Sequence, residues 1–115
     1  MNEPVIDPTV YAALQETTGA EFAAELVDTF LEEASDMLAE LHSARAENHA
    51  DRFRRAAHSL KSNGNTFGAV RLAALARELE LKGLDADPTR DTAALATLEV
   101  EYARAAAALK DLRNG

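Results

Sequence analysis

A regular apolar seam near the end of the chain sets the strongest limit on its fold. Its apolar residues recur at intervals of three and four positions, at Leu95, Leu98, Tyr102, Ala105, Leu109 and Leu112. Because an α-helix turns once in about 3.6 residues, this spacing gathers them on one side of a helix. A helix with such a long apolar side must cover it with other elements, so the seam predicts a helical bundle.

The same helical period recurs along the chain, and no stretch alternates apolar and polar residues as a strand would. Asp7-Pro8 and Asp87-Pro88 mark two helix starts, where the aspartate caps the helix and the proline takes a first position that needs no N–H donor. A length of 115 residues suits a single domain over 1–115. We predict an all-α fold, an antiparallel up-down four-helix bundle with a short additional N-terminal helix packed across one end. The expected helices cover approximately residues 8–17, 20–46, 50–67, 69–82 and 88–112.

One histidine stands out on the polar side of the expected helix 50–67. The apolar stripe of that helix consists of Phe53, Ala56, Ala57, Leu60, Gly64 and Phe67. His58 lies about 140° around the axis from Phe53, well away from that stripe. The histidine is therefore placed to meet a partner and not to fill the core.

Small and basic side chains surround this histidine on the helix. Arg54 and Lys61 lie one turn to either side, Ser62 follows on the same face, and Asn65 lies further along. Two glycines have structural interpretations. Gly64 lies on the inner stripe, which favours close helix packing, and Gly68 fits the left-handed position just past a helix end.

The stretch resembles histidine-containing phosphotransfer (HPt) domains, the four-helix-bundle relays of two-component signalling. His58, Leu60, Lys61 and Gly68 reproduce the family signature H-x-[LI]-K-x(6)-G. The family usually has glycine four residues after the histidine, and this chain has Ser62 there. Further similarities cover nearly the whole chain, at Asp7-Pro8, Leu14, Gly19, Phe22, Leu26, Phe30, Leu41, Leu72, Leu75 and Leu79-Glu80.

The resemblance implies a phosphorelay intermediate. His58 would accept a phosphoryl group on Nε2 from the aspartyl-phosphate of a receiver domain and pass it to another receiver. Such receivers belong to response regulators or hybrid histidine kinases. Lys61 would neutralise the phosphoryl oxygens, with Arg54 as a second cation and Asn65 as a supporting group. No cofactor is implied for this chain, because the Mg²⁺ of such transfers belongs to the receiver.

The histidine needs no dedicated base on this interpretation. An ordinary histidine is mostly neutral at pH 7, and nearby positive charge disfavours the imidazolium further. No sequence arrangement pairs His58 with a base, and no ATP-binding motif is present, so we expect a phosphoryl carrier and neither an enzyme nor an autokinase.

Charge is distributed unevenly in this acidic chain, whose formal net charge is −8. Six basic and two acidic residues between Arg45 and Arg71 give a local balance of +4, which leaves −12 for the rest. The acidic total argues against nucleic acid as a partner. The basic stretch predicts a complementary surface for an anionic partner or phosphoryl group. Its cations are Arg45, Arg52, Arg54, Arg55, Lys61 and Arg71.

Several other classes of function find no support in the sequence. The absence of cysteine excludes disulfides and thiolate metal sites. His42 and His49 lack the Glu-x-x-His pattern of bundle metal sites, so we expect them to be plain surface residues that bind no metal. The start Met-Asn-Glu-Pro lacks signal-peptide features and no run of about 18 apolar residues follows. We expect a cytoplasmic, bacterial, monomeric protein with no membrane partner.

Two alternative functions remain open at this stage. The chain could be a phosphoacceptor served directly by a chemotaxis-type histidine kinase, since Thr66-Phe67-Gly68 and the preceding motif also resemble the histidine domain of those kinases. It could also be a non-catalytic bundle that sequesters a response regulator. Replacing His58 by Gln separates relay from sequestration, because only the relay needs the imidazole.

Overall fold

The computed structural model describes residues 5–114, and within that range every regular element is a helix. This confirms the predicted all-α class. The elements are α1 (Pro8–Thr18), α2 (Ala20–Ala46), α3 (Ala50–Thr66), α4 (Val70–Lys82) and α5 (Pro88–Asn114). The largest departure from the expected bounds is at the last helix, which continues two residues past 112 to Asn114.

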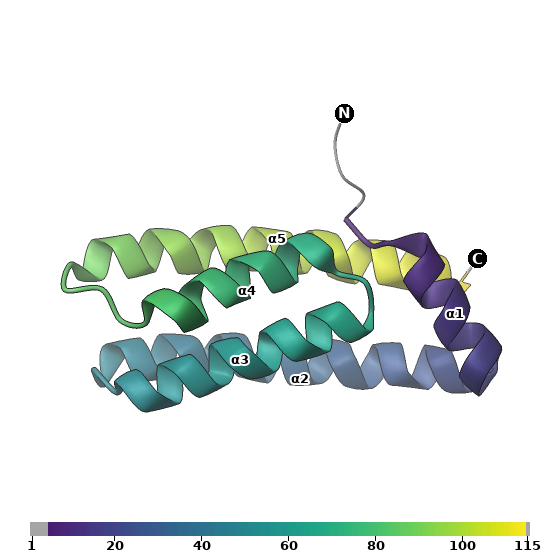
Figure 1. The fold of residues 1–115 in the computed structure, drawn as a ribbon, viewed down its shortest axis with the longest axis horizontal. Coiled ribbons are helices and arrows are strands. Elements are labelled where there is room, and N and C mark those ends of the chain that lie inside the picture. Colours follow the sequence, from purple (N-terminus) through teal and green to yellow (C-terminus); the bar gives the residue numbers. More distant parts are fainter. Residues whose placement is uncertain (1–4, 115) are drawn as a thin grey trace.

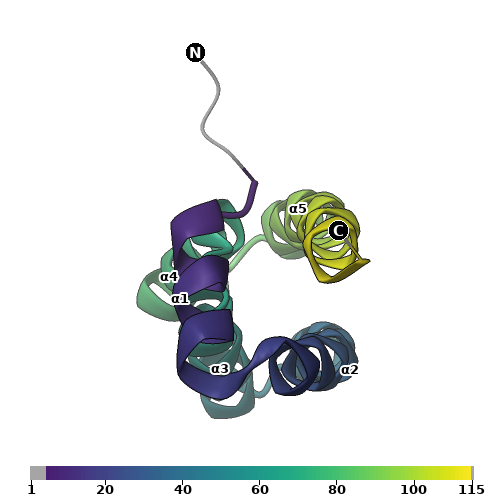
Figure 2. The same cartoon turned by 90° about the vertical axis from the view of Figure 1, so that its right-hand side faces the viewer.

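Four helices lie side by side along the length of an elongated molecule of 44 × 30 × 19 Å (Figure 1). The colours in Figure 1 show that successive helices from α2 to α5 run in opposite directions. α2 and α5 have 27 residues each, whereas α3 and α4 have 17 and 13. α1 lies across the end that the two shorter helices leave open, as the end-on view of Figure 2 shows. The most extensive packing is between α3 and α4, followed by α2 with α3.

Both Asp-Pro pairs begin helices in the same way. Asp7 Oδ1 accepts a hydrogen bond from the backbone N–H of Thr9 at 3.0 Å, and Asp87 Oδ1 accepts one from Thr89 at 3.0 Å. In each case proline follows as the first helical residue. The aspartates satisfy donors that the first turn of a helix leaves unpaired.

The core is a single cluster of apolar side chains to which all five helices contribute. The rings of Phe30 (α2) and Phe67, at the end of α3, stack with centroids 4.8 Å apart. Tyr102, in the apolar seam of α5, connects this helix to α2: its hydroxyl donates a hydrogen bond to the Leu31 carbonyl at 2.9 Å. Four members of that seam are fully buried, namely Leu95, Leu98, Ala105 and Leu109.

Phe22 departs from the apolar stripe of α2 that the sequence predicts from the three-and-four spacing of Phe22, Leu26, Phe30, Ala34, Met37 and Leu41. The sequence favours an inward Phe22, but 52% of its surface is exposed, while Ala23 and Val27 are buried instead. Figure 1 shows that α3 and α4 do not reach this end of α2. At this end α2 therefore packs only against α1 and α5. Its buried side chains begin with Ala23, one residue after Phe22.

None of the helices in residues 5–114 combines the length and the apolar character that crossing a bilayer requires.

Candidate functional site

His58 projects from the polar face of α3 toward a carboxylate on α4. Its side chain is 58% exposed, and its Nδ1 lies 2.5 Å from Oε2 of Glu80. Leu60 of α3 and Leu79 of α4, which lie close to His58 and Glu80 in the sequence, are buried. Since His58 and Glu80 lie just beside these buried positions, they meet along the outer edge of the α3–α4 contact.

The same carboxylate also holds a lysine. Lys61 donates from Nζ to Glu80 Oε1 at 2.7 Å, and the side chains of Lys61 and Glu80 are only 24% and 23% exposed. These contacts explain why the pKa of Glu80 lies below its usual range: the hydrogen bond from Lys61 lowers it most, burial opposes this, and the hydrogen bond from His58 lowers it further. Glu80 is thus an ionised acceptor at neutral pH.

An ionised carboxylate fixes the tautomer of a neutral imidazole beside it. Because a carboxylate can only accept hydrogen bonds, the proton of neutral His58 resides on Nδ1. The lone pair of the ring is then on Nε2. No residue of the described chain forms a hydrogen bond with Nε2, so this nitrogen is the one available to a partner.

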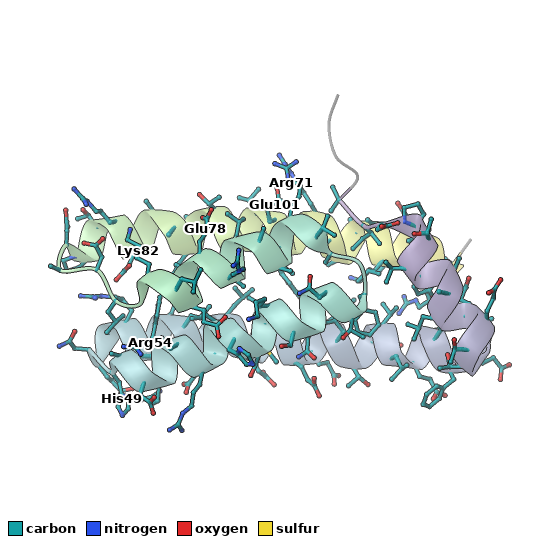
Figure 3. All side chains as sticks on the ribbon, viewed as in Figure 1. His49, Arg54, Arg71, Glu78, Lys82 and Glu101 are labelled. Carbon is teal, nitrogen blue, oxygen red and sulfur yellow. The ribbon has the colours of Figure 1, made fainter. Side chains whose placement is uncertain are left out.

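Arg54 brings a further cation to the site. It lines a shallow hollow of about 400 Å³ together with Arg55, His58, Ser59 and Glu80. Arg55 forms an ion pair with Asp51 at 2.5 Å, whereas Arg54 forms none with any residue of 5–114. Figure 3 shows Arg54 on α3, near the end of the molecule where α4 finishes at Lys82. We call the group of His58, Glu80, Lys61 and Arg54 the histidine site.

Ser62 and Asn65 lie further along α3. Ser62 is exposed one turn beyond His58. Asn65 is exposed two turns beyond it, at a rise of about 10 Å along the helix. The structure therefore gathers Arg54, Lys61 and Ser62 around His58 and leaves the Asn65 side chain outside the histidine site.

Gly64 and Gly68 allow close contacts at and just after the end of α3. A Cβ on Gly64 would lie 3.3 Å from Cβ of Ala73, so glycine lets α3 and α4 approach closely. Gly68 has φ +73°, the left-handed conformation that ends a helix, and its carbonyl accepts a hydrogen bond from Asp7 N–H at 2.8 Å. Gly68 thereby ties the α3–α4 turn to the start of α1.

The basic surface expected from the sequence is not free, and that prediction was wrong. Carboxylates pair with most of its cations, and in the pairs given next every carboxylate except Glu47 comes from outside the basic stretch. The ion pairs are Arg45–Asp91, Arg52–Glu40, Arg52–Glu47, Lys61–Glu80 and Arg71–Glu101. The two hydrogen-bonded glutamates raise the pKa of Arg52. Figure 3 shows the Arg71–Glu101 pair, where the partner carboxylate comes from α5.

The other two histidines also have contacts, although the sequence predicts plain surface residues. His49 caps α3, with Nδ1 accepting a hydrogen bond from Arg52 N–H at 3.3 Å. His42 Nε2 pairs with Glu99 of α5. Within residues 5–114 no lysine or arginine joins that second histidine–glutamate pair, in contrast to Glu80. The same part of the chain holds no group of three or more potential metal ligands.

Glu80 is the member of the site that sequence reasoning assigned no role. It lies 22 positions after His58, so no local spacing connects the two. A usable signal does exist: Leu79 faces inward on the helix that follows α3, and a carboxylate one position later falls at the edge beside α3.

Comparisons with known proteins place this geometry in a family context. The sequence profile described as "Hpt domain" matches residues 25–114. Among solved structures, the chain is similar to the crystal structure of histidine-containing phosphotransfer protein B (HptB) from Pseudomonas aeruginosa. The sequence identity is 30%, the match covers 98% of this chain and 97% of the other, and the TM-score is 0.85. No match was found among curated proteins.

Proposed function

This chain belongs to the Hpt domain family, and on that premise we propose that it is a histidine phosphotransfer protein of a multistep two-component phosphorelay. It accepts a phosphoryl group on His58 from the aspartyl-phosphate of one receiver domain and passes it to another. The observation that carries the proposal is the carboxylate of Glu80, which binds Nδ1 of His58 and Nζ of Lys61 at once. That arrangement prepares one ring nitrogen for attack and keeps a cation beside it.

The transfer step balances without a separate base. Nε2 of neutral His58 attacks the phosphorus in line, the N–P bond forms, and the P–O bond to the aspartyl carboxylate breaks with its electron pair going to that carboxylate. The proton stays on Nδ1. The ring becomes a positively charged phosphoimidazolium, and the Glu80 carboxylate stabilises that charge at 2.5 Å from Nδ1. In the onward transfer, the N–P bond breaks with its electron pair returning to Nε2, and a P–O bond to the aspartate of the next receiver forms.

The remaining residues of the site act through charge and access. Lys61 and Arg54 are the cations that neutralise phosphoryl oxygens, since a loose transition state depends chiefly on positioning and charge. Ser62, exposed on the docking path, leaves room for the receiver. Asn65 is too far along α3 to touch the phosphoryl group, so any role for it is in contact with the partner. Gly64 and Gly68 hold the scaffold.

We infer the wider context from the same premise. The scaffold is an antiparallel four-helix bundle capped by α1, supported by the alternating helix directions in Figure 1. The chain acts as a carrier and not as an enzyme, and Mg²⁺ enters with the receiver. Its partners are receiver domains of response regulators or hybrid histidine kinases. We propose a cytoplasmic monomer that binds neither nucleic acid nor membrane.

Intact-mass analysis tests the proposal. The wild type, His58→Gln and His42→Gln are each mixed with a panel of phosphorylated receiver domains, and any adduct is checked for acid lability. His42→Gln is a matched control because His42 also pairs with a glutamate. An acid-labile phosphate on wild type and His42→Gln, but not on His58→Gln, is expected. No adduct on the wild type from any receiver or from phosphoramidate would overturn the proposal, and receiver binding that survives in His58→Gln would then favour sequestration.

A further inference from the structure

A groove between α2 and α3 runs beside the histidine site. It encloses about 400 Å³, and Met37 and Ala56 form the apolar part of its lining. Glu33 and Asp36 line it from α2, and Arg52 and Arg55 line it from α3. The groove therefore offers an apolar floor between two charged walls.

This groove is continuous with the surface around the histidine. Arg55 and Ser59 line both the groove and the hollow that contains His58. A partner that covers His58 would therefore also reach the groove. Any side chain that the partner places there contributes to binding beside the reacting atoms.

The free charge of the groove is negative. Arg52 is held by Glu40 and Glu47, and Arg55 is held by Asp51, so the α3 wall is neutralised within the chain. No basic side chain of residues 5–114 forms an ion pair with Glu33 or Asp36, and both are exposed. Two uncompensated carboxylates thus border the apolar floor.

We propose that this acidic groove selects receiver domains that carry an apolar side chain flanked by a lysine or arginine. The inference rests on the proposed function and adds to it the chemistry of the partner surface. The apolar side chain covers Met37 and Ala56, and the cation pairs with Glu33 and Asp36. This reverses the sign expected from the sequence, because the two α3 cations of the groove, Arg52 and Arg55, are already paired and the unpaired charges of its α2 wall are acidic.

Charge reversal on α2 tests the groove. The double variant Glu33→Lys, Asp36→Lys is compared with Glu21→Lys, Glu25→Lys, which makes the same change in net charge near the start of α2 and outside the groove. Rates of phosphoryl transfer from a receiver that serves the wild type are measured at several salt concentrations. We expect the groove variant to be slower by about tenfold at low salt, with the difference shrinking as salt rises, and the control to stay within about twofold.

A milder pair keeps the test valid if the lysines disturb folding. Glu33→Gln, Asp36→Asn removes the charges with little change in shape, and we expect a smaller slowing in the same direction. Transfer to the wild type with unchanged rates in both groove variants would overturn the groove proposal alone. Equal slowing in the control would overturn it as well, because the effect would then come from net charge. No transfer to the wild type from any receiver would overturn the proposed function together with this inference.

Discussion

Glu80 on α4 and His58 on α3 lie 22 positions apart in the sequence, yet Oε2 of one is 2.5 Å from Nδ1 of the other. The contact assigns different tasks to the two ring nitrogens. Nδ1 is engaged by the scaffold, and Nε2 remains for chemistry. The helix pairing, and not the local sequence, determines which ring nitrogen has no hydrogen-bond partner within residues 5–114.

Replacing Glu80 by Gln is expected to slow phosphoryl transfer by about tenfold or more, because a neutral amide neither fixes the tautomer nor balances the phosphoimidazolium charge. The rate of phosphoryl transfer from one phosphorylated receiver is measured in reactions that are stopped at a series of times. Glu78→Gln is the matched control, since Glu78 lies on the side of α4 toward α5 (Figure 3). Equal rates in wild type and Glu80→Gln would remove Glu80 from the mechanism.

The stability contribution of Glu80 is expected to depend on pH. The hydrogen bonds of Lys61 and His58 lower the pKa of Glu80 in the folded protein. A depressed folded pKa stabilises the fold above the ordinary pKa of glutamate, and this contribution is lost as the pH falls through the folded value. Urea unfolding of wild type and Glu80→Gln should therefore differ at pH 7 and converge near about pH 2. A gap of constant size across that range would contradict the expectation.

Arg45→Ala is expected to destabilise the fold by about 3 kcal/mol, because it leaves a buried carboxylate without its cation. Asp91 is 1% exposed and accepts a hydrogen bond from Arg45 at 3.0 Å. Arg45 also donates to the Asp85 carbonyl at 3.1 Å, so it ties α2 to the loop before α5. Denaturant titration measures the loss. Arg55→Ala breaks an exposed pair with Asp51 and should cost less than about 1 kcal/mol. Similar losses in both variants would show that burial does not matter here.

Gly68→Ala and Gly19→Ala separate backbone strain from crowding. Both glycines have positive φ, +73° and +90°, so each substitution carries a strain of about 1–2 kcal/mol. A Cβ on Gly68 would also lie 3.0 Å from the Asp7 carbonyl oxygen, whereas nothing lies within 4 Å at Gly19. We expect Gly68→Ala to lower the free energy of unfolding further than Gly19→Ala, measured by thermal and urea unfolding. The reverse order would mean that α1 does not press on this turn.

Substitutions at Ser62 test the docking path. Ser62→Gly should leave transfer rates within a few fold, because a hydroxymethyl group obstructs little. Ser62→Lys and Ser62→Gln should slow transfer sharply, since a long side chain one turn beyond His58 stands where the receiver must approach. Transfer assays on all four proteins decide the matter. Identical rates would show that this face is not the approach route.

The sequence predicted the helices well because their signals are local. The three-and-four spacing of the seam from Leu95 to Leu112 and the Asp-Pro pairs specify helices without reference to the rest of the chain. The face of α3 that carries His58 follows from the same period. These features require only neighbours within a few turns.

The parts that sequence reasoning missed all depend on contacts between helices. Glu80 meets His58 only because α3 and α4 pack closely. The cations expected to be free are paired with carboxylates such as Glu40 and Asp91, which lie outside the basic stretch. Phe22 is exposed because α3 and α4 do not extend to that end of α2. Charge counted along a chain therefore gives a poor account of charge on the folded surface.

The Glu80 carboxylate, which His58 and Lys61 share, also affects how tightly the protein would hold a phosphoryl group. Lys61 is bound to Glu80 before any phosphoryl group arrives, so a phosphate on Nε2 must compete with that carboxylate for the ammonium. The attraction between Lys61 and the phosphate is therefore partly offset by the cost of weakening the Lys61–Glu80 ion pair. On the proposed function, we expect a carrier built this way to hold its phosphoryl group in a shallow free-energy well, which favours exchange in both directions over storage.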